Sequence, residues 1–206
     1  MTHTDQNNNS MFKITLNLTM ATLIAGVIIG VVFFFTAPIA EAQRIRQKKL
    51  SMQELVPDAA EFPEIEGKHE WFRAEKDGKV IAYLALTEQK GFDGHIKMFV
   101  ALTPDKKVIG YKVLSHRETP GLGDQAFKPK FAGQFTGKGL ENMELVKIQE
   151  EGKILAITGA TITSRAVTTA VKRVLTELDA YLNESNSGSK TEVKTESRTE
   201  SKTEHK

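Results

Sequence analysis

The sequence predicts an α+β domain that follows one N-terminal transmembrane helix. Three observations predict this fold class. Residues 14–40 contain no charged side chain, four strand-like stretches lie between residues 69 and 116, and an apolar pattern of helical spacing covers residues 163–183. The expected division of the chain is a polar N-terminal segment at 1–13, a transmembrane anchor at 14–40, a linker helix at 41–60, the α+β domain at 61–184 and a disordered tail at 185–206.

The anchor is predicted from the length of its apolar run. A helix needs about 20 mostly apolar residues to cross the hydrocarbon core of a bilayer, and the run at 14–40 supplies them. The alternative is a cleaved signal peptide, because "AEA" at 40–42 resembles a cleavage site. The apolar region of a signal peptide is only about 7–15 residues long, so a retained anchor is favoured.

The charges that flank the anchor predict an orientation. Lys13 precedes it, and four basic residues follow it: Arg44, Arg46, Lys48 and Lys49. Basic residues beside a span favour the cytoplasmic side. Taken alone, this bias predicts that the domain stays in the cytoplasm.

Four stretches of the domain are predicted to be antiparallel strands. They read "HEWFRAEK", "KVIAYLALTEQ", "HIKMFVALTP" and "KVIGYKVLSH". Asp77-Gly78 between the first two is a strong hairpin signal, and "GFDGH" and "PDKK" supply the next two turns. Antiparallel strands that pack against a helix or two give the α+β class.

The rest of the domain is predicted to be more irregular until its last helix. "DQAFKPKFAGQF" is expected to form a short helix broken at Pro129, and "MELVKIQEEGKILAI" a second hairpin. The helix at 163–183 is expected to start with Thr163 or Ser164 as its N-cap. Its apolar face consists of Val167, Ala170, Val171, Val174, Leu175, Leu178 and Leu182.

The tail from residue 185 is predicted to be a solvated coil. Its basic residues repeat every four positions and so do its acidic residues, which would stack like charges on a helix. It also has no apolar face to bury.

Composition excludes several classes of function. The 28 basic and 26 acidic residues leave a net charge of +2, so a nucleic-acid partner is not expected. The absence of cysteine removes disulfides, thiolate metal sites, iron–sulfur ligation and a cysteine nucleophile. The five histidines are scattered and no carboxylates cluster, so we predict no metal site and no catalytic residue.

The stretch "AITGATITSRAV" at 156–167 contains several hydroxyl residues and a glycine in front of a helix. Gly159 and Ala160 give a permissive backbone there. The free N–H groups of a helix N-terminus attract anions, and Arg165 could add positive charge, so a phosphate esterified to a threonine would be stabilised. The alternative is ordinary capping by a hydroxyl, and the pattern alone favours that alternative.

Three stretches of the chain resemble the FMN-binding domain family. "TGATITSRAV" is similar to the family's flavinylation motif, in which a threonine carries FMN through a phosphoester bond. "SHRETPGLGD" at 115–124 is similar to the loop that the family places against the flavin, and "GFDGHIKMFVAL" at 91–102 to its glycine-containing turn and central strand. With the anchor, these stretches follow the family's order over roughly residues 15–180.

The resemblance implies a set of FMN-binding residues. Thr161, the last threonine of Thr-Gly-Ala-Thr, is the expected attachment site. The other expected residues are Thr158, Gly159, Ala160, His116, Glu118, Thr119, Gly121, Leu122 and Gly123. For Gly121 and Gly123 an ordinary turn is an equal alternative to close approach to the flavin ring. His116 and Glu118 could tune the flavin or only form hydrogen bonds within the loop. Leu155 stands where the family's motif usually has an aspartate.

Within the family, the greatest resemblance is to the G subunits of Rnf electron transport complexes. It implies a covalent-FMN subunit that relays electrons in a membrane ion-translocating ferredoxin–NAD oxidoreductase and has no catalytic residues of its own. The implied partners are the other Rnf subunits and a flavin transferase of the ApbE type. The implied location is the cell inner membrane, with the flavin domain on the periplasmic or outer side, opposite to the charge bias; we favour this side. The alternatives are the C subunit of the Nqr-type quinone reductase, a membrane-tethered flavin-binding module that relays no electrons, and a structural assembly protein.

Overall fold

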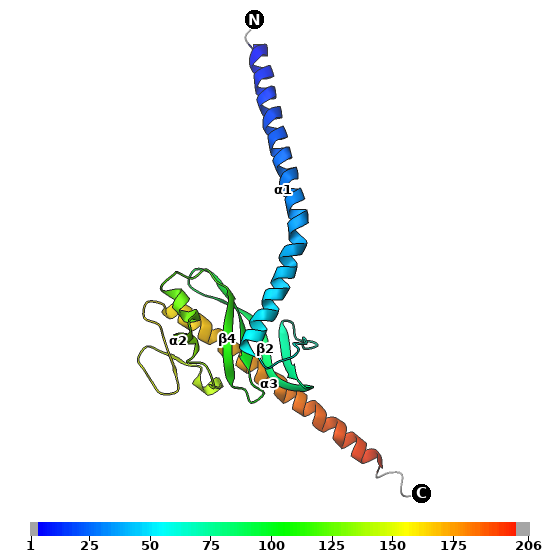
Figure 1. Cartoon of the computed structure of the whole chain (residues 1–206), viewed down its shortest axis with the longest axis vertical. Helices are drawn as coiled ribbons and strands as arrows, with labels where there is room; N and C mark the ends of the chain where they lie inside the picture. Colours follow the sequence, from blue (N-terminus) through cyan, green and yellow to red (C-terminus); the bar gives the residue numbers. More distant parts are fainter. Residues whose placement is uncertain (1–3, 201–206) are drawn as a thin grey trace. The chain divides into compact units, whose positions relative to one another are not determined.

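The computed structural model describes residues 4–200, and describes side chains for residues 11–37 and 41–184. The chain divides into two compact units, residues 1–48 and residues 49–206. Each unit is described by itself. The first unit is helical, and the second holds the sheet and all the remaining elements (Figure 1).

The first unit consists of the long helix α1 (Thr4–Leu55), whose last turns belong to the second unit. Within the described residues, one stretch is long and apolar enough to cross a membrane. It lies in Met11–Leu55, with a mean hydropathy of 2.5 and none of its apolar window buried. The expected apolar N-terminal helix is therefore present. It begins at Thr4 rather than after the polar segment, because a helix that has nucleated extends cheaply through further residues. Residues 1–3 of that segment lie outside the described residues.

The second unit is built on a four-stranded antiparallel sheet in the order β1-β2-β3-β4, which confirms the predicted α+β class (Figure 1). Its strands are β1 (Trp71–Lys76), β2 (Lys79–Lys90), β3 (His95–Leu102) and β4 (Val108–Ser115). The β1–β2 turn has positive φ at both central residues, 50° at Asp77 and 74° at Gly78. Such a turn matches the twist of its strands, which is why the Asp-Gly pair marks a hairpin.

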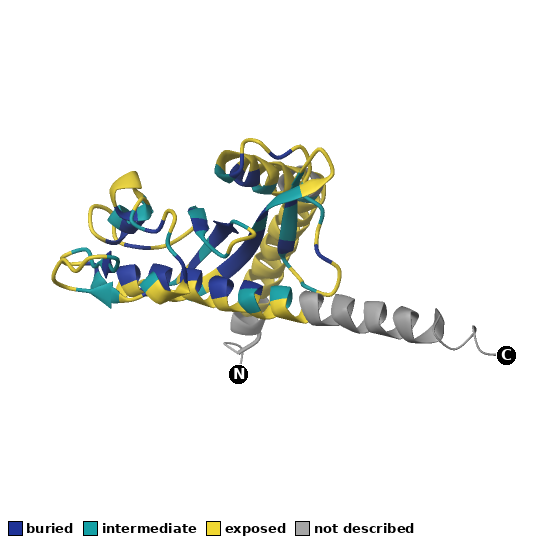
Figure 2. Ribbon diagram, turned by 90° about the horizontal axis from the view of Figure 1, so that it is seen from below, coloured by how far each residue is buried: buried dark blue, intermediate teal, exposed yellow. Residues whose placement is uncertain are grey.

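Both faces of the sheet are covered by apolar contacts. Ile96, Met98, Val100 and Leu102 of β3 belong to one buried cluster, together with the apolar face of helix α3 (Thr161–Glu200). Phe99 and Ala101, which alternate with them, belong to a second cluster that includes Met52 at the end of α1. The central strand is therefore buried on both faces. Figure 2 shows the buried residues of α3 on the side next to the sheet and exposed residues on the opposite side.

The segment between β4 and α3 contains only short elements. They are η1 (Gly123–Phe127), α2 (Pro129–Ala132), η2 (Leu140–Asn142), β5 (Leu145–Val146) and β6 (Ile154–Leu155). A short helix interrupted at Pro129 is present as expected. The predicted hairpin over residues 143–157 is wrong, since β5 and β6 pair in parallel. A hairpin requires a tight reversal, whereas residues 147–153 form a wider loop that brings the chain back in the same direction.

Helix α3 differs from the prediction at both ends. It begins at Thr161, so neither Thr163 nor Ser164 is its N-cap; both lie in its first turn and are buried. It also continues to Glu200, where a coil was expected from residue 185. Lysine, arginine and glutamate are good helix formers, and extension from a packed helix needs no new nucleus. Residues 201–206 of the expected coil lie outside the described residues.

Candidate functional site

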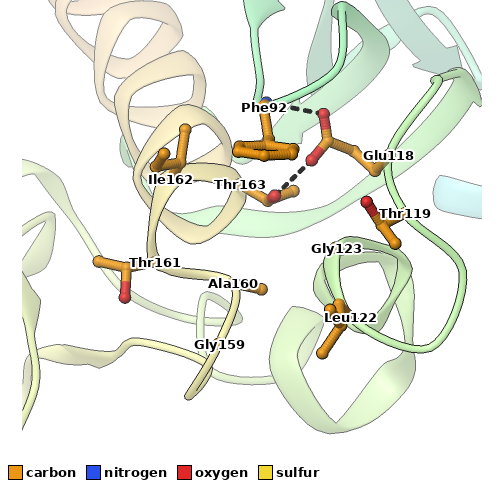
Figure 3. A pocket seen from close by; sticks show the side chains of 10 residues that line it. All are labelled: Phe92, Glu118, Thr119, Leu122, Gly123, Gly159, Ala160, Thr161, Ile162 and Thr163. Carbon is orange, nitrogen blue, oxygen red and sulfur yellow. Dashed lines mark hydrogen bonds between the residues drawn. The ribbon is translucent and has the colours of Figure 1, made fainter.

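A cavity of about 300 Å³ lies where three separate segments meet. The segments are the β2–β3 turn, the loop after β4 and the start of α3, which are the three stretches that the sequence analysis singled out (Figure 3). The residues that line the cavity are Phe92, Glu118, Thr119, Leu122, Gly123, Gly159, Ala160, Thr161, Ile162 and Thr163. Apolar side chains dominate this lining, and Glu118 carries its only ionisable side chain.

A β-turn leads the chain from β6 into α3. The N–H of Ala160 donates to the carbonyl oxygen of Ile157 at 3.0 Å, and Gly159 has a φ of +82°. A positive φ at the third position of such a turn favours glycine. Ser164 holds the turn closed, because its hydroxyl accepts from the N–H of Ile157 at 3.1 Å and donates to the carbonyl of Ala160 at 2.9 Å.

The start of α3 leaves its backbone donors free beside the cavity. Within the described residues, the N–H groups of Thr161, Ile162 and Thr163 donate to no backbone carbonyl. Free N–H groups and the positive end of the helix dipole favour an anion at this position. Arg165, which was expected to add positive charge, is exposed and is not part of the lining.

A second turn shapes the loop after β4. The N–H of Leu122 donates to the carbonyl oxygen of Thr119 at 3.2 Å, with Pro120 and Gly121 between them and a φ of +80° at Gly121. Proline followed by a positive-φ glycine is typical of a type II turn. A Cβ on Gly121 would meet nothing within 4 Å. Gly121 is therefore a turn glycine, and it does not line the cavity.

Gly123 is close-packed. A Cβ there would lie 2.8 Å from both Cβ and Oε2 of Glu118 and 3.0 Å from Oγ1 of Thr163. The chain therefore passes the Glu118–Thr163 pair at a distance that only glycine allows.

The buried carboxylate of Glu118 joins the three segments. Its Oε1 accepts from the N–H groups of Phe92 at 2.9 Å and Asp93 at 3.3 Å, both in the β2–β3 turn. Its Oε2 accepts from the hydroxyl of Thr163 in the first turn of α3. The side chain is only 3% exposed, so these bonds replace water around the carboxylate. Figure 3 shows the carboxylate between Phe92 and Thr163 at the wall of the cavity.

The hydroxyl groups of the Thr-Gly-Ala-Thr region differ in availability. Thr163 is 1% exposed and donates to Glu118, and Ser164 is fully buried and donates to Ala160. Thr158 is exposed but lines a different cavity, of about 470 Å³, together with Leu155 and Gln134. Thr161 lines the first cavity and is partly exposed, and its hydroxyl points away from Glu118 (Figure 3). It is thus the accessible hydroxyl of the motif at this cavity.

The remaining sequence-predicted residues divide into two groups. Gly159, Ala160, Glu118, Thr119, Leu122 and Gly123 line the cavity with Thr161, whereas Thr158, His116 and Gly121 do not. The ring of His116 packs on Phe127 with centroids 4.4 Å apart, and its Nδ1 accepts from the N–H of Glu118 at 3.3 Å. His116 therefore supports the loop.

Three lining residues were not among the predicted site residues. They are Phe92, Ile162 and Thr163. All three lie inside the stretches that carry the family resemblance, and Phe92 and Ile162 are unusually exposed for large apolar side chains, at 65% and 52%. An apolar side chain in a turn and another beside the motif threonine are the sequence signals that point to Phe92 and Ile162.

The arrangement suits a ligand with an apolar, planar portion and a phosphate. The exposed side chains of Phe92, Leu122 and Ile162 offer apolar contact, and the free N–H groups at the start of α3 offer donors to an anion. Among the described residues, no group of three His, Cys, Asp or Glu side chains could hold a metal ion.

Comparisons with known proteins identify the family of this chain. The FMN-binding domain family matches residues 91–176, which include all three segments of the cavity. The G subunit of the proton-translocating ferredoxin:NAD(+) oxidoreductase complex of Clostridium ljungdahlii is 43% identical over 178 residues, covering 86% of this chain and 96% of the relative. The G subunit of the ion-translocating oxidoreductase complex of Methanosarcina acetivorans is 28% identical, covering 77% of this chain and 89% of the relative. Among solved structures, NqrC of Shewanella oneidensis has 23% identity and a TM-score of 0.44, over 61% of this chain and 73% of that one.

Proposed function

Because the chain belongs to the family of G subunits of the Rnf-type ion-translocating ferredoxin:NAD(+) oxidoreductase complexes, we propose that it carries FMN covalently on Thr161 and relays electrons within such a complex. Membership of this family indicates that the chain binds FMN and takes part in electron transfer. The covalent bond, its position and the relay role are the proposal.

The observation that carries the proposal is the state of the Thr161 hydroxyl. It lies at the cavity, partly exposed, while the neighbouring hydroxyls of Thr163 and Ser164 are buried and already donate hydrogen bonds. A phosphoester on Thr161 would lie at the start of α3, where free N–H groups favour its negative charge. The protein thus offers an available hydroxyl of the motif and an anion site together.

The residues of the cavity fit FMN. The ring system of FMN is planar and has an apolar dimethylbenzene edge, which the exposed apolar side chains of Phe92, Leu122 and Ile162 can contact. FMN supplies the electron-transfer chemistry when it is bound. The chain's own residues position it and set the electrostatics around it.

The partners and the location belong to the proposal as well. Covalent attachment requires a flavin transferase, for which the ApbE type is our candidate, and electron relay requires neighbouring redox subunits of the complex. The apolar stretch in Met11–Leu55 would anchor the chain once in the cell inner membrane, and we place the flavin domain on the periplasmic or outer side.

Two alternatives are less well supported. The sequence relatives described above are G subunits, which favours Rnf over the C subunit of an Nqr-type quinone reductase. A membrane-tethered module that binds flavin without a covalent bond would not need an available hydroxyl at the cavity. Covalently bound flavin stays attached when the protein is denatured, whereas non-covalently bound flavin is released.

The test is in-gel flavin fluorescence of the full chain, co-expressed with a flavin transferase and run under denaturing conditions. We expect a fluorescent band for the parent chain and none for Thr161→Val, because the attachment oxygen is gone while the side-chain volume is kept. Peptide mass spectrometry should place the FMN mass on the peptide that contains Thr161.

Thr163→Val and Thr158→Val are the matched controls, and both should keep the band. Thermal unfolding of all three variants shows that each is folded. An undiminished fluorescent band from folded Thr161→Val would refute the assignment of Thr161. The absence of a fluorescent band from the parent chain would refute covalent attachment itself.

A further inference from the structure

Glu118 is the only charged group in the lining of the FMN cavity, and this suggests a role beyond holding the loop. The other lining residues are apolar side chains, threonines and glycines. The Glu118 carboxylate forms part of the wall of this cavity, so it would lie close to any flavin bound there. We propose that the negative charge of Glu118 lowers the reduction potential of the bound FMN; this inference rests on the proposed function.

The hydrogen bonds to Glu118 stabilise its negative charge but do not neutralise it. All three donors are neutral groups: two backbone N–H groups in the β2–β3 turn and the hydroxyl of Thr163. Both carboxylate oxygens accept, so the geometry suits the ionised form. No ion pair to Glu118 is found among the described side chains, and the nearest basic residue in sequence, Arg117, lies against Gly94 on the turn.

The carboxylate is also fixed in place. A Cβ on Gly91 would lie 2.3 Å from Oε1 of Glu118, and one on Gly123 would lie 2.8 Å from Oε2. The two glycines thus let backbone close around the carboxylate from both sides. Because the side chain is 3% exposed, water screens its charge poorly, and the charge cannot swing out to solvent.

A fixed negative charge disfavours reduction of the flavin for a simple electrostatic reason. Bound FMN would supply two-electron redox chemistry, and reduction with the uptake of only one proton would add one negative charge to the cavity beside Glu118. That charge is repelled by the carboxylate, and the repulsion is strong in a poorly screened site. The reduced form is destabilised, so the reduction potential falls.

Glu118→Gln is the variant that separates charge from shape. The glutamine oxygen can still accept from the N–H of Phe92, and the amide can donate to the hydroxyl oxygen of Thr163, so the same contacts are kept without the charge. We expect the ratio of reduced to oxidised FMN at a fixed external potential to rise at least tenfold, which is about 30 mV for a two-electron couple.

Thr163→Val is the matched variant for the hydrogen bond. It removes the donor and keeps the charge, so the potential should not rise, in contrast to Glu118→Gln. If Glu118 served only to hold the loop in place, Glu118→Gln, which keeps the contacts, would leave the potential unchanged, whereas Thr163→Val, which removes one of them, would shift it. Glu151→Gln, an exposed carboxylate outside the cavity lining, controls for net charge and should leave the potential unchanged.

The measurement is a redox titration by absorbance of the full-length flavoprotein in detergent, after the covalent flavin content of each variant has been determined. A parent chain without covalent flavin would overturn the proposed function. An unchanged potential in flavin-loaded, folded Glu118→Gln would overturn only the inference about Glu118.

Thr119→Lys provides the test if Glu118→Gln does not fold. Thr119 is an exposed lining residue next to Glu118, so its replacement adds a positive charge without touching the buried hydrogen bonds. We expect a raised potential, and an unchanged one would overturn the inference.

Discussion

Gly121 and Gly123 lie in the same loop, and each is glycine for a different physical reason. Gly121 has a φ of +80° and open space around its Cα, so its backbone conformation is what excludes a side chain. Gly123 needs no special φ, but a Cβ there would overlap with Glu118 and approach Thr163 too closely. The first glycine shapes the turn, and the second lets the loop approach the start of α3.

This difference predicts different outcomes for two alanine variants. Gly121→Ala should lower the free energy of unfolding by about 1–2 kcal/mol, because alanine is strained at positive φ, and leave the FMN potential unchanged. Gly123→Ala should cost a similar amount, about 1–3 kcal/mol, through overpacking, and should also alter the FMN spectrum and potential because it displaces Glu118. Chemical denaturation and redox titration of both variants check this. A changed potential in Gly121→Ala would return that glycine to the flavin site.

At the level of single residues, the sequence predicted which residues line the cavity better than it predicted their contacts. Thr161 and Gly159 line the cavity, and the motif fixes their order in the chain. The partnership of Glu118 with Thr163 could not be predicted, since the two residues are far apart in sequence and meet only when the β2–β3 turn closes over them. The packing of His116 on Phe127 could not be predicted for the same reason, because it depends on where η1 turns, whereas its hydrogen bond within the loop is one of the two alternatives given for it.

Among the elements, strand β4 is tied to η1 by a buried tyrosine. The hydroxyl of Tyr111 donates to the carbonyl oxygen of Ala126, and its ring packs edge-on against Phe135 with centroids 5.4 Å apart. Burial raises the pKa of Tyr111 well above the ordinary tyrosine value of about 10. The folded domain therefore keeps a proton on Tyr111 at pH values where the unfolded chain has lost it.

The shifted pKa predicts a loss of stability in alkali. The contribution of Tyr111 is fully present below about pH 10 and is lost as the pH rises toward the folded pKa, by up to about 1.4 kcal/mol per pH unit. Tyr111→Phe should be about 1 kcal/mol less stable at pH 7, because the hydrogen bond to Ala126 is lost, but its stability should fall less steeply above pH 10. Urea titrations of both proteins from pH 7 to 11 test this. Tyr83, whose pKa burial also raises, is present in both, so equal slopes would contradict the role given to Tyr111.

The regular elements were predictable from sequence, and the short ones were not. Asp77-Gly78 and the alternation along β2 and β3 encode the meander locally, and the apolar spacing of α3 encodes its buried face. The pairing of β5 with β6 spans only two residues in each strand. It is supported by the side chain of Gln134, which accepts from the N–H of Leu155 at 2.8 Å and donates to its carbonyl at 3.3 Å. Because β6 is held partly by the side chain of Gln134, its sequence shows no periodic pattern from which the strand could be predicted.

At the scale of the whole molecule, two arguments about the membrane oppose each other. Arg44, Arg46, Lys48 and Lys49 follow the apolar run, and only Lys13 precedes it, so the charge bias alone would retain the domain in the cytoplasm. The family resemblance implies the outer side. The first basic residue after Ala40 is Arg44, about 6 Å further along a helix, so these charges lie outside the apolar run but close enough to it to favour the cytoplasmic side. An outer location of the domain therefore requires partner subunits to fix the orientation against this bias.

The absence of cysteine makes the orientation directly testable, because any introduced cysteine is the only thiol in the chain. Glu66 is exposed in the second unit, and Ser10 precedes the apolar run. In intact spheroplasts treated with a membrane-impermeant maleimide, we expect Glu66→Cys to be labelled and Ser10→Cys to be labelled only after lysis, because the reagent reaches only the outer face. Labelling of both variants after lysis is the control for thiol accessibility. The reverse pattern would place the domain in the cytoplasm, in agreement with the charge bias, and the flavin with it.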